Sequence, residues 1–164
     1  MPDSAVEFTN PVLEDGPFVY DLVAQSKPLD LNSRYFYLVQ CGHFSKTCVR
    51  ACLNGELVGW VSGHLLPEQN NVLFVWQVAV SAQARGMGLA VQMIQWLLAK
   101  HPAVRQVHTS ITPGNKASWG LFESLARRWG TQITRSDWFH SQQHFQGNHD
   151  TEVLVQLSVP ARNE

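Results

Sequence analysis

One short loop carries the clearest chemical signal in this sequence. It follows the apolar run Val72–Val80 and contains the pattern Gln83-x-x-Gly86-x-Gly88. Glycines at such positions let the backbone approach a bound group without interference from Cβ atoms. Free N–H groups at a helix start, together with the positive end of the helix dipole, favour phosphate groups. The loop therefore predicts an anion-binding site, to which Arg85 can add charge-assisted hydrogen bonds.

Other residue types that commonly carry chemistry give weaker signals. No Ser-His-Asp set is evident, and the three cysteines, Cys41, Cys48 and Cys52, lack a repeated Cys-x-x-Cys pattern. We interpret these cysteines as core or surface thiols rather than nucleophiles. Several histidines lie in the C-terminal part of the chain, at His101, His108, His140, His144 and His149. Their spacing matches no tight ligand motif, so we predict no metal site.

The composition is that of an ordinary globular protein. The chain has 164 residues, of which 45% are hydrophobic and 15% charged, and its formal net charge is −1. This balance gives no electrostatic footprint for nucleic acid or for an anionic membrane. No apolar run approaches the roughly 18 residues of a membrane span, and the N-terminus lacks a secretory pattern. An odd number of cysteines in a sequence without a secretory pattern favours reduced thiols. We therefore expect a cytoplasmic protein.

The predicted anion loop needs a strand before it and a helix after it, and the hydrophobic pattern supplies both. Val72–Val80 is typical of a buried strand, and apolar residues spaced by four form a helical stripe between Leu89 and Pro102. Asn54-Gly55 is a strong hairpin signal, and Pro67–Asn71 indicates a second turn. Further strands are expected at Ala5–Asn10, Thr47–Leu53, Glu56–Leu66, Gln106–Thr112, Thr131–Arg135 and Glu152–Val159, with helices after Glu14, Ser33 and Asn115 and a long loop over Asp137–Asp150.

In chain order these elements predict one α/β domain over residues 1–164, with a mixed sheet and helices on both faces. Two tight turns in a row make the strands up to Val80 antiparallel. Gln106–Thr112 follows a crossover helix, so we expect it to pair in parallel with Val72–Val80. The prediction is therefore a mostly antiparallel sheet with one parallel pair.

Two motifs in their structural context resemble a known family. The pattern Gln83-x-x-Gly86-x-Gly88 resembles the pyrophosphate-binding signature of the GNAT N-acetyltransferases, and Thr112-Pro113-x-Asn115-x-x-Ser118 resembles a helix start of the same fold. More narrowly, almost the whole chain is similar to the L-2,4-diaminobutyrate acetyltransferases of ectoine synthesis. The stretches that carry this resemblance are Leu29–Ser33 with Tyr35, Phe74–Val80, Ala84–Ala90 and Thr112–Ser118. One departure is Ser81-Ala82, where this family often has Asp-Pro, which we expect to change loop stiffness more than binding.

The resemblance implies the GNAT fold and acetyl-CoA as cosubstrate, with no metal. Val78 is then expected to offer a backbone N–H to the thioester oxygen, where negative charge develops. Transfer is implied to go directly to the 4-amino group of the substrate in a ternary complex. The residues implied to bind the coenzyme are Val78, Val80, Gln83, Arg85, Gly86, Met87, Gly88, Leu89, Ala90, Asn115 and Ser118.

The acceptor would bring two ammonium groups and one carboxylate, so carboxylates are expected in its pocket. Asp30 is a candidate base or amine anchor and Glu152 a second anchor, although each can also be a turn or strand-edge charge. Trp76 either belongs to the core or borders the cation, and His149 is either a proton relay or a solvated loop residue. The substrate-binding residues that the resemblance implies are Asp30, Tyr35, Trp76, Thr112, Asn115, His149 and Glu152.

Some relatives in this fold place a tyrosine where Phe122 stands here, to protonate the departing thiolate, and phenylalanine cannot do so. Other small amines, such as ornithine, lysine or a polyamine, remain alternative acceptors. An acyl-CoA-binding module without acceptor chemistry is a further alternative. Members of the fold often dimerise, and the aromatic pair Trp138-Phe139 makes a homodimer our prediction.

Overall fold

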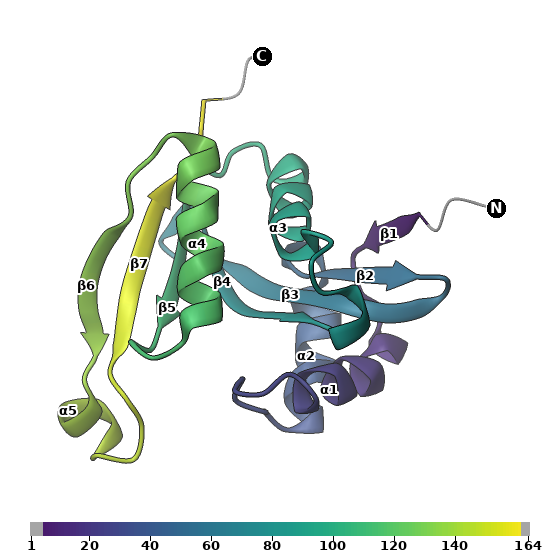
Figure 1. The fold of residues 1–164 in the computed structure, drawn as a ribbon, viewed down its shortest axis with the longest axis horizontal. Coiled ribbons are helices and arrows are strands. Elements are labelled where there is room, and N and C mark those ends of the chain that lie inside the picture. The colour runs from purple at the N-terminus through teal and green to yellow at the C-terminus, as the bar shows by residue number, and fades with distance from the viewer. Residues whose placement is uncertain (1–4, 162–164) are drawn as a thin grey trace. The chain divides into compact units, whose positions relative to one another are not determined.

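The computed structural model describes residues 5–161 and builds a seven-stranded sheet with the order β1-β2-β3-β4-β5-β7-β6 (Figure 1). The strands are β1 (Val6–Thr9), β2 (Val49–Leu53), β3 (Glu56–Leu66), β4 (Gln69–Val80), β5 (Gln106–Ile111), β6 (Thr134–Phe139) and β7 (Glu152–Ser158). The helices are α1 (Gly16–Ala24), α2 (Arg34–His43), α3 (Leu89–Lys100), α4 (Lys116–Trp129) and α5 (Ser141–Phe145), with 3-10 turns η1 (Leu13–Asp15), η2 (Ser45–Thr47) and η3 (Ala82–Ala84).

Strand pairing agrees with the predicted fold class. β4 and β5 pair in parallel, with Val72–Phe74 opposite Gln106–His108. The pairs β1–β2, β2–β3, β5–β7 and β6–β7 are antiparallel. The mixed sheet with one parallel pair is therefore confirmed.

The described residues form two compact units, which we call the first and the second unit. The first unit contains the residues up to His64 together with Val75–Pro102, and the second contains Leu65–Phe74 and the residues from Ala103 onward. Strand β4 thus passes from the second unit to the first between Phe74 and Val75.

In the first unit, helices cover both faces of the strands. Trp60 of β3 lies in one buried cluster with Val19 of α1 and Tyr37 of α2. On the opposite face, a Cβ atom added to Gly59 would lie 2.9 Å from the Met93 Cε of α3. Since neighbouring residues of a strand face opposite ways, α1 and α2 pack on one side and α3 on the other. The absence of a side chain at Gly59 is what permits this close approach of α3.

The hairpin between β2 and β3 turns at Asn54 and Gly55, as predicted. Both residues have positive φ, 52° and 80°, which is the conformation that a two-residue turn of this kind requires. Leu53 pairs with Glu56 directly at the turn, and the register shifts between Ala51 and Cys52. The second predicted turn is shorter than Pro67–Asn71, because β4 already begins at Gln69. The first three residues of β4, Gln69–Asn71, are polar and exposed, which is also typical of a turn.

In the second unit, β5 pairs with β7 over six residues, from Gln106 opposite Ser158 to Ile111 opposite Val153. Helix α4 buries Phe122 and Leu125 as predicted, whereas Leu121 is only half-buried. Gly130 ends this helix in the left-handed conformation, with φ of 61°.

Two predictions in the second unit are wrong. The strand expected at Thr131–Arg135 lies three residues later, because Gly130 and the residues after it complete the helix end. The expected loop Asp137–Asp150 contains the end of β6 and the short helix α5. All six residues of β6 are exposed at the sheet edge, so the strand lacks the alternating pattern that would reveal it.

Candidate active site

The loop between β4 and α3 has the backbone of an anion site. Gly86 and Gly88 have φ of +83° and +70°, in the left-handed region that favours glycine. Gly88 precedes α3 and supplies no side-chain cap for the helix. The first N–H groups of a helix have no acceptor within the helix itself. The loop therefore has two left-handed glycines directly before a helix start that no side chain of Gly88 caps.

The polar side chains at Gln83 and Gln92 are engaged in hydrogen bonds of their own. Gln83 Nε2 donates to the Glu56 carboxylate at 3.3 Å, so its amide is directed toward β3. Gln92 Nε2 donates to the Met87 carbonyl at 2.9 Å and holds that carbonyl in place. Arg85 and Met87 are exposed, whereas Leu89 is buried and fixes the first turn of α3 to the core.

Trp76 is not a core residue, although it lies in the strand that precedes the loop. Its side chain is 47% exposed. The edges of two other rings meet it, with centroid distances of 5.0 Å to Phe36 and 6.0 Å to His64. Val78 and Val80, which follow on the same face, are half-buried. The first unit therefore presents one accessible indole beside the strand residues expected to contact the coenzyme.

Asp30 lies in the loop before α2, where the residue is exposed and its backbone is held by β4. The Asp30 carbonyl accepts a hydrogen bond of 2.6 Å from Gln77 Nε2 of β4, while the residue itself is exposed. Ser33 caps α2 by accepting from the Phe36 N–H at 3.1 Å. Tyr35 lies in the first turn of α2 and is 77% exposed. Asp30, Tyr35 and Trp76 therefore all belong to the first unit and present accessible side chains.

In the second unit, His149 and Glu152 lie together, with 3.8 Å between His149 Nε2 and Glu152 Oε1. His149 Nδ1 lies 2.7 Å from the Asp150 carbonyl, which can only accept a hydrogen bond. Nδ1 must therefore carry a proton, so Nε2 carries one only when the ring is charged. The Phe145 ring lies 4.6 Å from the imidazole and covers part of it. The Asp150 carbonyl thus orients the histidine, and the other ring nitrogen lies near the Glu152 carboxylate.

The start of α4 uses two predicted residues for its own structure. Asn115 Oδ1 accepts from the Ser118 N–H at 3.2 Å, which makes Asn115 the helix cap. The Thr112 carbonyl accepts from the Asn115 N–H and from Trp119 Nε1, both at 3.1 Å. Contacts from these residues to a ligand must therefore come from the Asn115 NH₂ group and the Ser118 hydroxyl. Phe122, one turn further, is buried with 2% of its surface exposed.

The cysteines have the properties of structural thiols. Burial raises the pKa of Cys41 and of Cys48 to about 12, and it also raises the pKa of Cys52. Since the thiolate is the nucleophilic form, these groups are unreactive near neutral pH. No cluster of metal-ligating side chains occurs among residues 5–161. Within the same residues, no helix is long and apolar enough to cross a membrane.

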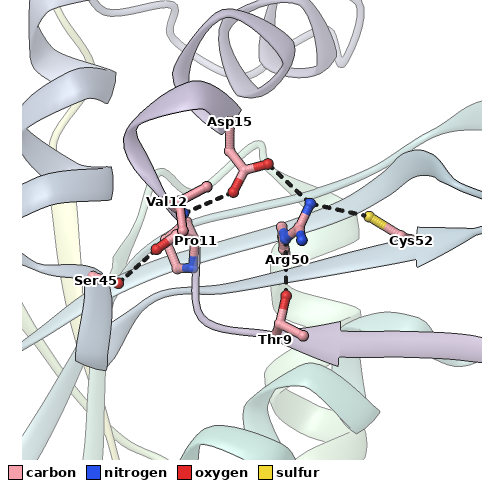
Figure 2. A network of polar contacts seen from close by, with 7 residues as sticks. All are labelled: Thr9, Pro11, Val12, Asp15, Ser45, Arg50 and Cys52. Carbon is pink, nitrogen blue, oxygen red and sulfur yellow. Dashed lines mark hydrogen bonds and ion pairs between the residues drawn. The ribbon is translucent and has the colours of Figure 1, made fainter.

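The first unit also has a cleft of about 610 Å³ that contains only one predicted site residue, Gln83. Three of its lining residues, Asp15, Arg50 and Cys52, belong to the polar network shown in Figure 2. In this network Asp15 accepts from Arg50 at 2.9 Å and from the Val12 N–H at 2.7 Å. Arg50 Nε also donates to Thr9 at 2.8 Å. The Arg50 guanidinium is thereby paired within the protein, and the network connects β1, β2 and η1.

Residues that the sequence reasoning missed are Gln77 and Tyr37. Gln77 is buried within an apolar strand, and Tyr37 donates its hydroxyl proton to Gln77 Oε1 at 3.1 Å. The signal was a lone amide in a strand of valines, because a buried amide needs hydrogen-bond partners.

The sequence of this chain is similar to that of known acetyltransferases. The acetyltransferase (GNAT) family matches residues 17–126. The chain is 45% identical to the L-2,4-diaminobutyric acid acetyltransferase of Methylotuvimicrobium alcaliphilum over 93% of this chain and 90% of that protein. It is 44% identical to the enzyme of the same name from Vibrio cholerae, over 95% and 91% of the two chains.

A solved structure agrees in fold over the whole length. The diaminobutyrate acetyltransferase EctA from Paenibacillus lautus, solved with its substrate L-2,4-diaminobutyric acid and coenzyme A, matches with a TM-score of 0.89. The identity is 30%, and the match covers 98% of this chain and 99% of that chain.

Proposed function

This chain belongs to the acetyltransferase (GNAT) family and, within it, to the L-2,4-diaminobutyric acid acetyltransferases, and on that premise we propose how its residues perform the reaction. The protein is an acetyltransferase that acts on diaminobutyrate with acetyl-CoA as cosubstrate. We place the transferred acetyl on the 4-amino group, giving N4-acetyl-L-2,4-diaminobutyrate for ectoine synthesis. Because the family match spans residues of both units, we treat residues 1–164 as one catalytic domain.

The loop from Gln83 to Ala90 is proposed to bind the diphosphate of acetyl-CoA. One observation carries this assignment, namely the left-handed conformation of Gly86 and Gly88 directly before the uncapped start of α3. An added Cβ at Gly86 would meet no atom within 4 Å, so open space lies beside the loop. Arg85 is exposed beside this space and can neutralise part of the phosphate charge.

Val78 and Val80 of β4 are proposed to line the pantetheine arm, with the Val78 N–H directed at the thioester oxygen. A donor that is already fixed in place stabilises the charge that develops there without reorganisation. From α4, the Asn115 NH₂ group and the Ser118 hydroxyl are proposed as further coenzyme contacts, because their other atoms cap the helix. Thr112 at the end of the preceding strand is assigned to the acceptor.

The acceptor amine is proposed to meet Asp30, Tyr35 and Trp76 in the first unit. The accessible indole offers a face to an ammonium group, and the Asp30 carboxylate offers a countercharge. Glu152 and His149, which lie close together in the second unit, are proposed as a second amine anchor and as a proton relay. Histidine is the side chain whose chemistry best suits a proton relay.

Acetyl transfer needs an unprotonated amine, whose pKa of about 10.4 keeps it charged at neutral pH. Asp30 or the His149–Glu152 pair accepts the proton as the amine nitrogen bonds to the thioester carbon. The carbon–sulfur bond then breaks and coenzyme A leaves as a thiolate. Because Phe122 is buried and has no proton to give, water supplies the proton to the thiolate or the thiolate leaves unassisted.

We also propose that the enzyme works in the cytoplasm as a homodimer. Cys41, Cys48 and Cys52 are free thiols, as a reducing compartment requires. Trp138 and Phe139 stack at 3.9 Å on the exposed edge strand β6, with 38% and 37% of their surfaces accessible. Aromatic side chains of this kind are enriched where subunits meet.

Steady-state kinetics of the variants Asp30→Asn and Glu152→Gln test the acceptor assignment. A lost hydrogen bond between charged groups, about 1.5–3 kcal/mol, should raise the KM for diaminobutyrate about 10- to 100-fold. The KM for acetyl-CoA should stay within about twofold. Asp21→Asn in the first unit and Glu123→Gln in the second are matched controls, because Asp21 lies on α1 and Glu123 pairs only with Arg135 at the surface. Equal changes in both KM values would make Asp30 and Glu152 structural.

The same assay compares acceptor amines. Wild-type enzyme should acetylate diaminobutyrate with a higher kcat/KM than ornithine, lysine or a polyamine. A preference for one of those amines would overturn the acceptor, and acetyl-CoA binding without any transfer would reduce the protein to a binding module.

A further inference from the structure

A buried amide on β4 fastens the loop that carries Asp30. Gln77 has only 7% of its surface exposed, and its side chain uses both polar atoms. Nε2 donates to the Asp30 carbonyl at 2.6 Å, and Oε1 accepts from the Tyr37 hydroxyl at 3.1 Å. The Gln77 backbone N–H donates to the Ser62 hydroxyl of β3 at 3.2 Å. The side-chain amide is therefore held at both of its polar atoms, and the backbone of the same residue is held by β3.

The Tyr37 hydroxyl extends this connection to a second point of the same loop. It accepts a hydrogen bond from the Asn32 N–H at 3.3 Å, two residues beyond Asp30. Tyr37 is fully buried, and the rings of Tyr20 and Phe36 meet it at 6.1 Å and 5.2 Å. Its hydroxyl therefore has little freedom to follow a moving loop. The backbone is held on both sides of Leu31 by groups that belong to the core.

These hydrogen bonds, which we call the Asp30 fastening, connect the Asp30 loop to the strand that carries Trp76, and both are assigned to the amine. Gln77 is the chain neighbour of Trp76, and adjacent strand residues face opposite sides. The indole is thus presented outward while the amide next to it reaches inward to the Asp30 backbone. A buried network whose members are all satisfied holds a single arrangement, whereas a broken one leaves unpaired groups that drive rearrangement.

We propose that Gln77 is a positioning residue for the acceptor: by holding the Asp30 backbone it sets where the Asp30 carboxylate stands relative to Trp76. This inference rests on the proposed role of Asp30. Gln77 touches neither substrate and acts through the loop. The loop Gly86–Ala90, which we assign to acetyl-CoA, has no part in the network, so the effect of Gln77 is confined to the amine.

The variant Gln77→Met keeps the length of the side chain and removes both hydrogen-bonding atoms. We expect the KM for diaminobutyrate to rise about tenfold, as for loss of one to two buried hydrogen bonds. The KM for acetyl-CoA should change by less than about twofold. Ser62→Ala is the matched control, because it removes a contact of the same residue but leaves both links to the loop. It should leave both KM values unchanged even where it lowers the melting temperature.

A double-variant cycle separates positioning from general loss of structure. If Gln77 acts through Asp30, then Gln77→Met should add less than about twofold to the KM of Asp30→Asn. Should Gln77→Met fail to fold, Tyr37→Phe removes only the hydroxyl that holds Asn32 and must show the same selective rise. A full tenfold effect in the Asp30→Asn background overturns the proposal, as does an equal rise in both KM values.

Hydrogen exchange of the amides from Leu29 to Asn32 supplies a readout that needs no activity. Exchange should be faster in Gln77→Met than in wild type, and unchanged in Ser62→Ala. Unchanged exchange in Gln77→Met would show that Gln77 does not hold the loop. If the wild type fails to acetylate diaminobutyrate, the assigned acceptor is wrong, while the exchange result still decides whether Gln77 holds the loop.

Discussion

Replacing Gly86 with alanine isolates the conformational demand of the anion loop. Gly86 has φ of +83°, and an added Cβ would find no atom within 4 Å. The substitution therefore introduces no steric overlap, only the left-handed backbone, which disfavours an L-residue by about 1–2 kcal/mol. The loop is exposed from Arg85 to Gly88, so it can relax locally when the coenzyme is absent.

Binding must then restore the strained conformation, so the 1–2 kcal/mol estimate converts into a Kd for coenzyme A that is about 5- to 30-fold higher. The melting temperature of the free protein should hardly change. Isothermal titration calorimetry with coenzyme A measures the first quantity and thermal unfolding the second.

Gly55 provides a matched control. It has φ of +80°, and an added Cβ there also meets nothing within 4 Å, but it lies in the tight β2–β3 hairpin. Because the strand register holds that turn, Gly55→Ala cannot relax and should lower the melting temperature by about 2–8 °C. Its Kd for coenzyme A should equal that of wild type. If Gly86→Ala binds coenzyme A as tightly as wild type, the loop does not hold the diphosphate.

Two further predictions follow from burial. Because burial raises the pKa of Cys41 and Cys48 to about 12, a thiol reagent at about pH 8 should modify neither in the folded protein, and the variant Cys41→Ala should keep its kcat. Rapid modification of either thiol without unfolding would contradict this. Burial also lowers the pKa of His64 and His108 below 6.5, so the folded state holds them neutral, and the stability that they contribute is present above about pH 6.5 and lost as the pH falls through the folded pKa. Urea unfolding should therefore show a smaller acid-induced loss of stability in His64→Gln/His108→Gln than in wild type, and an equal loss would exclude both histidines as the cause.

Local signals in the sequence were sufficient wherever a short segment determines its own conformation. Asn54-Gly55 forms the predicted turn because both residues tolerate positive φ, and Ser33 and Asn115 cap their helices as their positions suggest. The edge strand β6 was misplaced because all of its residues are exposed and carry no alternation. Periodicity locates an element only when one of its faces is buried.

The residues that pack around the candidate site were less predictable than the site residues themselves. Alternation along β4 cannot decide whether Trp76 is core or surface, because it does not show what covers a face of the strand. The neighbouring rings, Phe36 and His64, come from other elements of the chain. The contact between Gln77 and Tyr37 spans 40 residues of sequence. Such contacts exist only after β4 and α2 have packed, so no local pattern encodes them. A glutamine among apolar strand residues nevertheless indicates that a partner must exist.

The passage of β4 between the two units has a consequence for how the protein is made. The first unit is complete once Pro102 has been synthesised, whereas Val72–Phe74 of β4 meets its parallel partner β5 only after His108 has followed. Chains emerge from the ribosome at about 5–20 residues per second, and units fold as they become complete. We therefore expect the coenzyme loop and the hydrogen bonds to the Asp30 loop to form on the ribosome, while the parallel pairing of β4 waits for β5.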